Sequence, residues 1–147
     1  MSFFGYDPAS FRWEGVSESA YKDYPGAARG MAWRRISRHT LVRGSFEVRY
    51  FELAPGGFSS LEKHAHEHAV ICVRGRGTAL VGSAVHELRP LDLVRSGPWA
   101  AHRWVNAGDE PFGFLCIVEA QRDRPAPLDD AEWEALLADP LTAPFAH

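Results

Sequence analysis

Residues 61–68 read Leu-Glu-Lys-His-Ala-His-Glu-His and lead directly into the apolar run AVICVR at residues 69–74. Alternate side chains of an extended chain share a face. Residues spaced two apart here can therefore converge on one side: Glu62, His64, His66 and His68. Imidazole and carboxylate groups bind first-row divalent metals, so this stretch indicates a metal site. A further ligand must come from elsewhere in the chain, and His102 is the obvious candidate.

Short strands separated by glycine and proline turns surround this stretch. The expected strands are Phe46–Leu53, Ala69–Arg74, Thr78–Val81, Val85–Leu88, Leu91–Arg95 and Phe112–Glu119. The first of them should end at the turn signal Ala54-Pro55-Gly56-Gly57. Many short strands at intervals of roughly ten residues predict an all-β sandwich or barrel.

The two ends of the chain differ from this pattern. Residues 1–45 are rich in glycine, proline and aromatic residues, which predicts an irregular N-terminal arm that packs on the barrel or on a second subunit. Residues 120–147 predict a short helix, because Asp129 is a good N-cap and Glu132 completes a capping box. Pro140 should end this helix. With a barrel core at about 46–119, the 147 residues fit a single domain.

The histidine stretch and its flanking glycines resemble the cupin superfamily over about residues 46–119. The first cupin signature is Gly, five residues, His-x-His, three or four residues, Glu, six residues, Gly. The second is Gly, five residues, Pro-x-Gly, two residues, His, three residues, Asn. This resemblance implies a double-stranded β-helix, that is, a jelly-roll barrel with one metal ion held inside it.

One alignment of the first signature matches the family pattern at every spacing. With Gly75 as the closing glycine, His68 occupies the glutamate position and His64 the second histidine position. The first histidine position falls on Glu62, and Gly56 becomes the opening glycine. Glutamate and histidine are thus exchanged relative to the usual cupin order, but the sum of three imidazoles and one carboxylate is kept.

The alternative alignment takes His64 and His66 as the His-x-His pair. The third ligand position then falls on Val70 or Ile71, neither of which binds metal, and the opening glycine on Phe58. His66 is therefore interpreted as a loop residue or a support for the ligands, although its replacing Glu62 as a ligand stays open. The predicted metal ligands are Glu62, His64, His68 and His102.

The second signature fits in spacing but departs in composition. His102 is followed three residues later by Asn106, as in the family. The three positions that carry glycine, proline and glycine in the family hold Leu91, Gly97 and Trp99 here. The turn before His102 should therefore differ from the usual one, while the histidine itself is retained.

Composition excludes several classes of function. The formal net charge is −3 and the basic residues are scattered, which argues against a nucleic-acid partner or a polybasic membrane patch. No apolar window is long enough for a membrane helix, and residues 1–10 lack the pattern of a secretory signal. We therefore expect a cytoplasmic protein in which Cys72 and Cys116 are buried, reduced thiols.

The resemblance implies one divalent transition-metal ion, which can be Fe, Mn, Ni, Cu, Co or Zn. Four protein ligands leave a coordination position open, as in catalytic sites. The first hypothesis is a metal-dependent enzyme on a small oxygenated substrate, of dioxygenase, isomerase or decarboxylase type. The alternative is a non-catalytic binding module, such as a sensor or metal-binding accessory protein. The aromatic arm and the family's habit of pairing barrels favour a homodimer.

Overall fold

The computed structural model describes residues 2–24 and 26–147 and confirms a mostly β protein with one short α-helix. The strands are β1 (Tyr6–Asp7), β2 (Arg12–Trp13), β3 (Glu18–Ser19), β4 (Arg34–Arg43), β5 (Phe46–Phe58), β6 (His68–Arg74), β7 (Gly77–Val81), β8 (Ala84–Leu88), β9 (Leu93–Ser96), β10 (His102–Val105) and β11 (Phe112–Glu119). Helix α1 spans Asp130–Ala138, and a 3-10 turn follows at Ala143–Phe145. In the described parts of the chain, no helix is long and apolar enough to cross a membrane.

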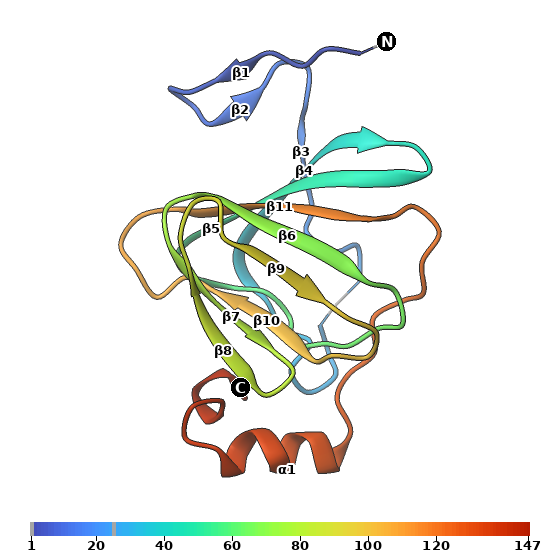
Figure 1. Ribbon diagram of the computed structural model, residues 1–147, viewed down its shortest axis with the longest axis vertical. Helices are drawn as coiled ribbons and strands as arrows, with labels where there is room; N and C mark the ends of the chain where they lie inside the picture. Colours follow the sequence, from blue (N-terminus) through green and yellow to red (C-terminus); the bar gives the residue numbers. More distant parts are fainter. Residues whose placement is uncertain (1, 25) are drawn as a thin grey trace.

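Strand β5 is the centre of the sheet and joins its two halves. The order along the nine-stranded antiparallel sheet is β8-β7-β10-β5-β11-β6-β9, with β4 added to β5 and β3 to β4. Because β5 is long, its first part pairs with β4 and β11, whereas its last residue, Phe58, pairs with Val105 of β10. The sheet thereby curls into the nearly closed barrel seen in Figure 1. The predicted jelly-roll architecture is confirmed.

The hydrophobic core fills the barrel from the inward faces of β5, β6, β7 and β11. On β11 the alternate residues Phe112, Phe114, Cys116 and Val118 are all buried. Phe112 and Phe114 pair directly with Leu53 and Phe51 of β5. This alternation of buried positions is the period-two geometry of an extended strand.

The prediction that residues 1–45 are irregular was wrong for β4. This ten-residue strand pairs along β5, yet its inward-facing residues are Ile36, Arg38 and Thr40. Since only one of the three is apolar, the strand carries no hydrophobic alternation that a sequence pattern can detect. Two aromatic residues of the arm do pack on the barrel, since the Phe11 and Trp13 rings lie 5.5 and 5.1 Å from the Tyr50 ring, whereas Phe3 is exposed.

The turn predicted at residues 54–57 is a bulge inside β5, not the end of a strand. Between the pairs Ile36–Leu53 and Arg34–Phe58 the register shifts, so β5 carries more residues than its partner. Gly56 has φ +76°, a left-handed conformation that glycine adopts without strain. Gly75 also has a positive φ, +61°, and a Cβ there would lie 2.1 Å from Pro111 O. The two signature glycines thus occupy positions that require glycine.

The C-terminal helix begins as predicted. Asp129 accepts a hydrogen bond from the Glu132 backbone N–H, and the Glu132 side chain accepts one from the Asp129 N–H. Trp133 and Leu136 pack with Leu61 and Leu80 of the barrel in a second apolar cluster. The helix therefore closes one end of the barrel, opposite the β1–β2 hairpin (Figure 1).

Candidate metal centre

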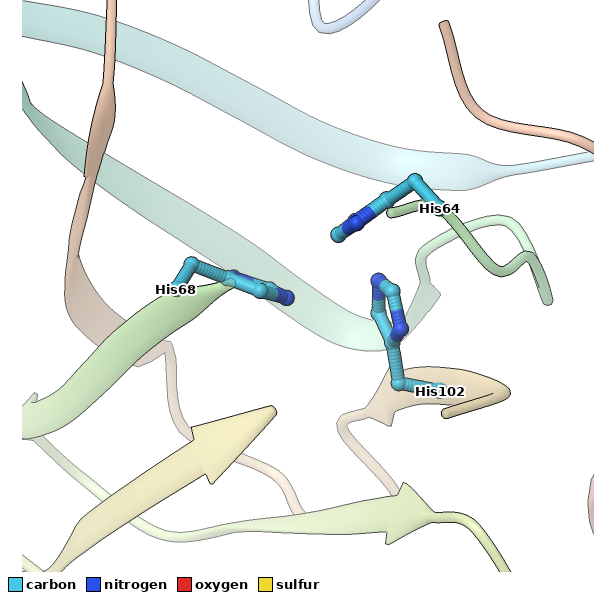
Figure 2. Close-up of side chains that lie close together, drawn as sticks. All are labelled: His64, His68 and His102. Atoms are coloured by element: carbon cyan, nitrogen blue, oxygen red, sulfur yellow. The ribbon is translucent and has the colours of Figure 1, made fainter. Parts of the chain in front are cut away.

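Three of the four predicted ligands meet inside the barrel. His68 and His102 are the first residues of β6 and β10, and His64 lies in the loop before β6. All three are buried, and each offers one ligand atom within 4.8 Å of the others. Figure 2 shows the three rings pointing toward one another from these separate segments. Three histidines are therefore positioned to bind one metal ion.

The rings are held by hydrogen bonds on their Nδ1 atoms. His64 Nδ1 donates to the His66 carbonyl at 2.7 Å, and His102 Nδ1 donates to the Ala100 carbonyl at 2.9 Å. His68 Nδ1 lies 3.4 Å from Cys116 Sγ. Metal-binding histidines usually have their second nitrogen engaged in this way, which fixes the ring and leaves Nε2 for the metal.

The Nε2 atom of His68 gives an independent indication of a ligand. It is buried and has no hydrogen-bond partner among the described residues. Buried polar atoms are nearly always paired, because an unpaired one loses its hydration without compensation. A metal ion shared with the other two histidines would satisfy this atom, so the residues present fit a metal.

The protonation state of the cluster also suits a metal. Burial, followed by the neighbouring His102, lowers the pKa of His64 to about 4 and that of His68 to about 2. Burial likewise lowers the pKa of His102. The histidines are therefore neutral near pH 7, and the neutral imidazole is the form that coordinates metals.

These lowered pKa values predict how the metal-free protein responds to acid. The unfolded chain takes up protons below the ordinary histidine pKa of 6.5, whereas folded His64 does so only near 4. Stability should thus be full above pH 6.5 and fall toward pH 4, by at most about 1.4 kcal/mol per pH unit for each such histidine. Urea unfolding at several pH values measures this slope. His68→Gln should reduce this slope, whereas His86→Gln, which replaces an exposed histidine, should leave it unchanged. Identical slopes in the two variants would contradict a lowered pKa at His68.

Glu62 is buried beside the cluster but is engaged elsewhere. Its Oε2 atom accepts hydrogen bonds from Lys22 Nζ and, at 2.5 Å, from Ser60 Oγ. The backbones of Glu62 and His102 bond to each other in both directions, which fixes the loop against β10. Glu62 lines the same cavity as the histidines, although its carboxylate is not among the three converging ligand atoms.

His66 supports the cluster without joining it. Its ring stacks on His64 with 3.6 Å between the ring centroids. Asp123 holds this loop by accepting hydrogen bonds from the Ala65 and His66 N–H groups at 2.7 and 3.0 Å, and it contacts His66 Nδ1 at 2.7 Å. These hydrogen bonds lower the pKa of the Asp123 carboxyl. Asp123 was missed in the sequence because it lies outside every motif.

The histidines open into a cavity of about 430 Å³, whose walls come from both halves of the sheet and from the N-terminal arm. This volume lies within the range of roughly 300–1,000 Å³ that is usual for small-molecule sites. The arm contributes Tyr21 and Lys22, and β4 and β5 contribute Arg38 and Arg49. The cavity is thus lined by charged as well as aromatic groups.

Cys116 brings a thiol to the wall of this cavity. It lies on β11 directly opposite Arg49 of β5, whose Nη2 donates a hydrogen bond to Sγ at 3.2 Å. Burial raises the pKa of the Cys116 thiol, and Arg49 opposes that rise. Cys72, which shares the alternation of His68, is instead packed in the apolar core away from the cavity. Both cysteines are buried and free in the structure.

Comparison with known proteins agrees with this arrangement. The family model for the cupin domain matches residues 49–118. A relative from Rhodospirillum rubrum, 1-methylthio-D-xylulose 5-phosphate methylsulfurylase, is 41% identical over 140 residues, which covers 93% of this chain and 87% of the relative.

Two solved structures are similar along nearly their whole length. A cupin-2 domain protein of Rhodospirillum rubrum is 42% identical, covers 92% of this chain and 90% of its own, and superimposes with a TM-score of 0.81. A cupin 2 conserved barrel domain protein of Rhodopseudomonas palustris is 35% identical, with 98% of each chain covered and a TM-score of 0.86. Sequence, fold and histidine cluster lead to one conclusion: this chain belongs to the cupin superfamily.

Proposed function

We propose that this cupin is a metal-dependent enzyme that removes the methylthio group from a phosphorylated ketose. The meeting of three histidines and one thiol in a single cavity carries the proposal. The 41% identity with 1-methylthio-D-xylulose 5-phosphate methylsulfurylase supports this substrate class over dioxygenase, isomerase or decarboxylase chemistry. A small-molecule substrate was predicted from the sequence, and the cavity is of a suitable size.

His64, His68 and His102 would hold the divalent ion, and we keep Glu62 as the proposed fourth ligand because it lines the same cavity beside His102. A bound ion would polarise a carbonyl oxygen of the substrate. The metal's identity, the homodimer and the cytoplasmic location stay predictions.

Cys116 is the residue to which we assign the sulfur chemistry. A thiolate that attacks the substrate sulfur forms an S–S bond, breaks the C–S bond and leaves the electron pair on the carbon beside the ketone. The adjacent carbonyl group delocalises this electron pair until the carbon takes up a proton. A second thiol from solution then exchanges with the mixed disulfide and restores Cys116. Arg49, which donates to Sγ, favours the thiolate and so opposes the effect of burial, which raises the pKa of this thiol.

The test is turnover of 1-methylthio-D-xylulose 5-phosphate by protein loaded with each candidate metal in turn, with dithiothreitol as the second thiol. We expect the methylthio proton signal of the substrate to disappear from the NMR spectrum. Binding without turnover for every metal would favour the alternative of a non-catalytic module.

Replacing Cys116 by serine should lower turnover by at least about 100-fold, because a hydroxyl is a far weaker nucleophile toward sulfur. The matched control is Cys72→Ser, which changes the core thiol and should leave turnover within about twofold. Metal content, measured by elemental analysis, should be the same in both variants. Undiminished turnover by Cys116→Ser would remove the cysteine from the reaction.

A further inference from the structure

Two arginines face the cavity from neighbouring strands. Arg49 stands two residues before the core residue Phe51 on β5 and therefore shares its inward face. Arg38 on β4 is paired directly with Phe51 and faces the same way. Both arginines line the cavity that holds the histidine cluster. Two positive charges thus stand side by side on one wall.

Neither guanidinium forms an ion pair with a carboxylate in the part of the chain that the structure describes. Arg38 Nε donates to Ser19 Oγ at 3.1 Å, and Arg49 Nη2 donates to Cys116 Sγ at 3.2 Å. The Nε atom of Arg49 is buried and has no hydrogen-bond partner among the described residues. Several donors of the pair therefore remain for a ligand.

Several other arginines of the molecule are paired with a carboxylate. Arg12 and Arg74 share the carboxylate of Glu52, at 3.1 and 2.7 Å. Arg122, which also reaches the cavity, is paired with Glu47 at 2.9 Å.

Charges withdrawn from solvent are normally paired or fully hydrogen-bonded. Arg103 also lacks a carboxylate, but carbonyl groups such as those of Ser59 and Phe145 accept its hydrogen bonds. Among the described residues, Arg38 and Arg49 each donate a single side-chain hydrogen bond, so these two stand out.

The pKa of Arg38 reflects this lack of a carboxylate partner. Its pKa is lowered first by burial and then by the positive charges of Arg49 and Arg43, while Glu47 and Asp23 only partly offset this. The repulsion between the two guanidinium groups is thus incompletely compensated within the protein. An anion between them would gain attraction from both.

We propose that Arg38 and Arg49 form the binding site for the phosphate group of the substrate. This inference rests on the proposed function, which supplies a phosphorylated substrate. Guanidinium groups suit phosphate because their planar, forked N–H donors match its oxygens. Arg49 contacts Cys116, which in turn contacts His68, so the anion site adjoins the reacting groups. A substrate anchored there by its phosphate has its carbon chain at the histidine cluster.

The direct test uses inorganic phosphate as the probe and full-length, metal-free protein, so that phosphate cannot bind to a metal. Calorimetric titration should give saturable binding to the wild type. Arg38→Gln and Arg49→Gln should each raise the Kd for phosphate at least about tenfold. Arg76→Gln removes the same charge from an exposed turn and should leave the Kd within about twofold. Equal phosphate affinity in the wild type and both cavity variants would overturn the inference.

Further variants separate this role from that of the thiol. Cys116→Ser should keep the wild-type phosphate affinity, and Arg49→Lys should recover part of what Arg49→Gln loses, since it keeps the charge. In turnover, Arg38→Gln should raise KM more than it lowers kcat. An unchanged KM would reject the phosphate site and leave the proposed reaction standing. If the protein binds phosphate through both arginines but does not turn over the methylthio sugar, the proposed reaction is rejected and the phosphate site stands.

Discussion

Replacing His102 by alanine is expected to lower the affinity of the protein for a divalent ion by about 100-fold or more. His102 is the single converging ligand supplied by β10, and its ring is already held in place by the Ala100 carbonyl. Alanine removes both the donor atom and this orientation. Since changes to groups that merely orient a ligand already cost roughly 10- to 100-fold in metal affinity, loss of a ligand should cost at least as much.

Calorimetric titration with Co²⁺ and Ni²⁺ measures this effect. His86→Ala, on the exposed strand β8, serves as the control and should bind both ions like the wild type. Far-ultraviolet circular dichroism checks that both variants are folded. Wild-type affinity in folded His102→Ala would mean that the ion does not use this histidine, and the proposed metal centre would be wrong.

The histidine cluster was predictable because most of its information is local. The spacing between Gly56, His64, His68 and Gly75 lies within one stretch of chain, and each glycine turned out to occupy a left-handed conformation. The C-terminal helix was predictable for the same reason, since its capping box joins residues only three positions apart. Local patterns of this kind do not depend on which strands become neighbours.

The other cavity residues depend on pairing between distant strands. Cys116 and Arg49 become neighbours because β11 lies against β5, and Arg38 joins them because β4 lies on the other side of β5. The sequence predicts the strand β11 from its apolar residues but not its partner or its register. The sequence therefore predicts Cys116 only as a buried thiol, whereas the strand pairing places it beside Arg49 and His68.

Strand β10 was missed for a different reason. Its residues His102 and Arg103 are both fully or nearly buried, so it lacks the polar and apolar alternation of an ordinary strand. Arg103 is satisfied by carbonyl groups far away in the chain, including those of Ser59 at 2.9 Å and Phe145 at 2.8 Å. A strand whose polar side chains are buried by tertiary contacts cannot be detected from hydrophobic periodicity.

The second large effect is expected at Lys22, whose ammonium group bonds to the Glu62 carboxylate. The side chains of Lys22 and Glu62 are only 7% and 8% exposed. Lys22→Met leaves the Glu62 charge buried with Ser60 as its remaining hydrogen-bond donor, and breaking a buried pair in this way costs roughly 3–5 kcal/mol. The free energy of unfolding of the metal-free variant, measured in urea, should fall by about 3 kcal/mol. Lys63→Met, which breaks a partly exposed pair with Glu132, should cost less than about 1 kcal/mol.

Metal should reverse much of this loss if Glu62 is the fourth ligand. In Lys22→Met the carboxylate no longer has an ammonium partner, so a divalent ion at the histidines becomes its best remaining counter-charge. We expect Co²⁺ to bind this variant about tenfold more tightly than the wild type, and saturating Co²⁺ to restore stability, because binding to the folded state alone stabilises it. The double variant Lys22→Met/Glu62→Gln has no buried charge to neutralise, so it should regain metal-free stability and lose the extra affinity. If Lys22→Met binds Co²⁺ no more tightly than the wild type does, and Glu62→Gln binds it equally well, Glu62 serves as the partner of Lys22 and the ion is held by the histidines alone.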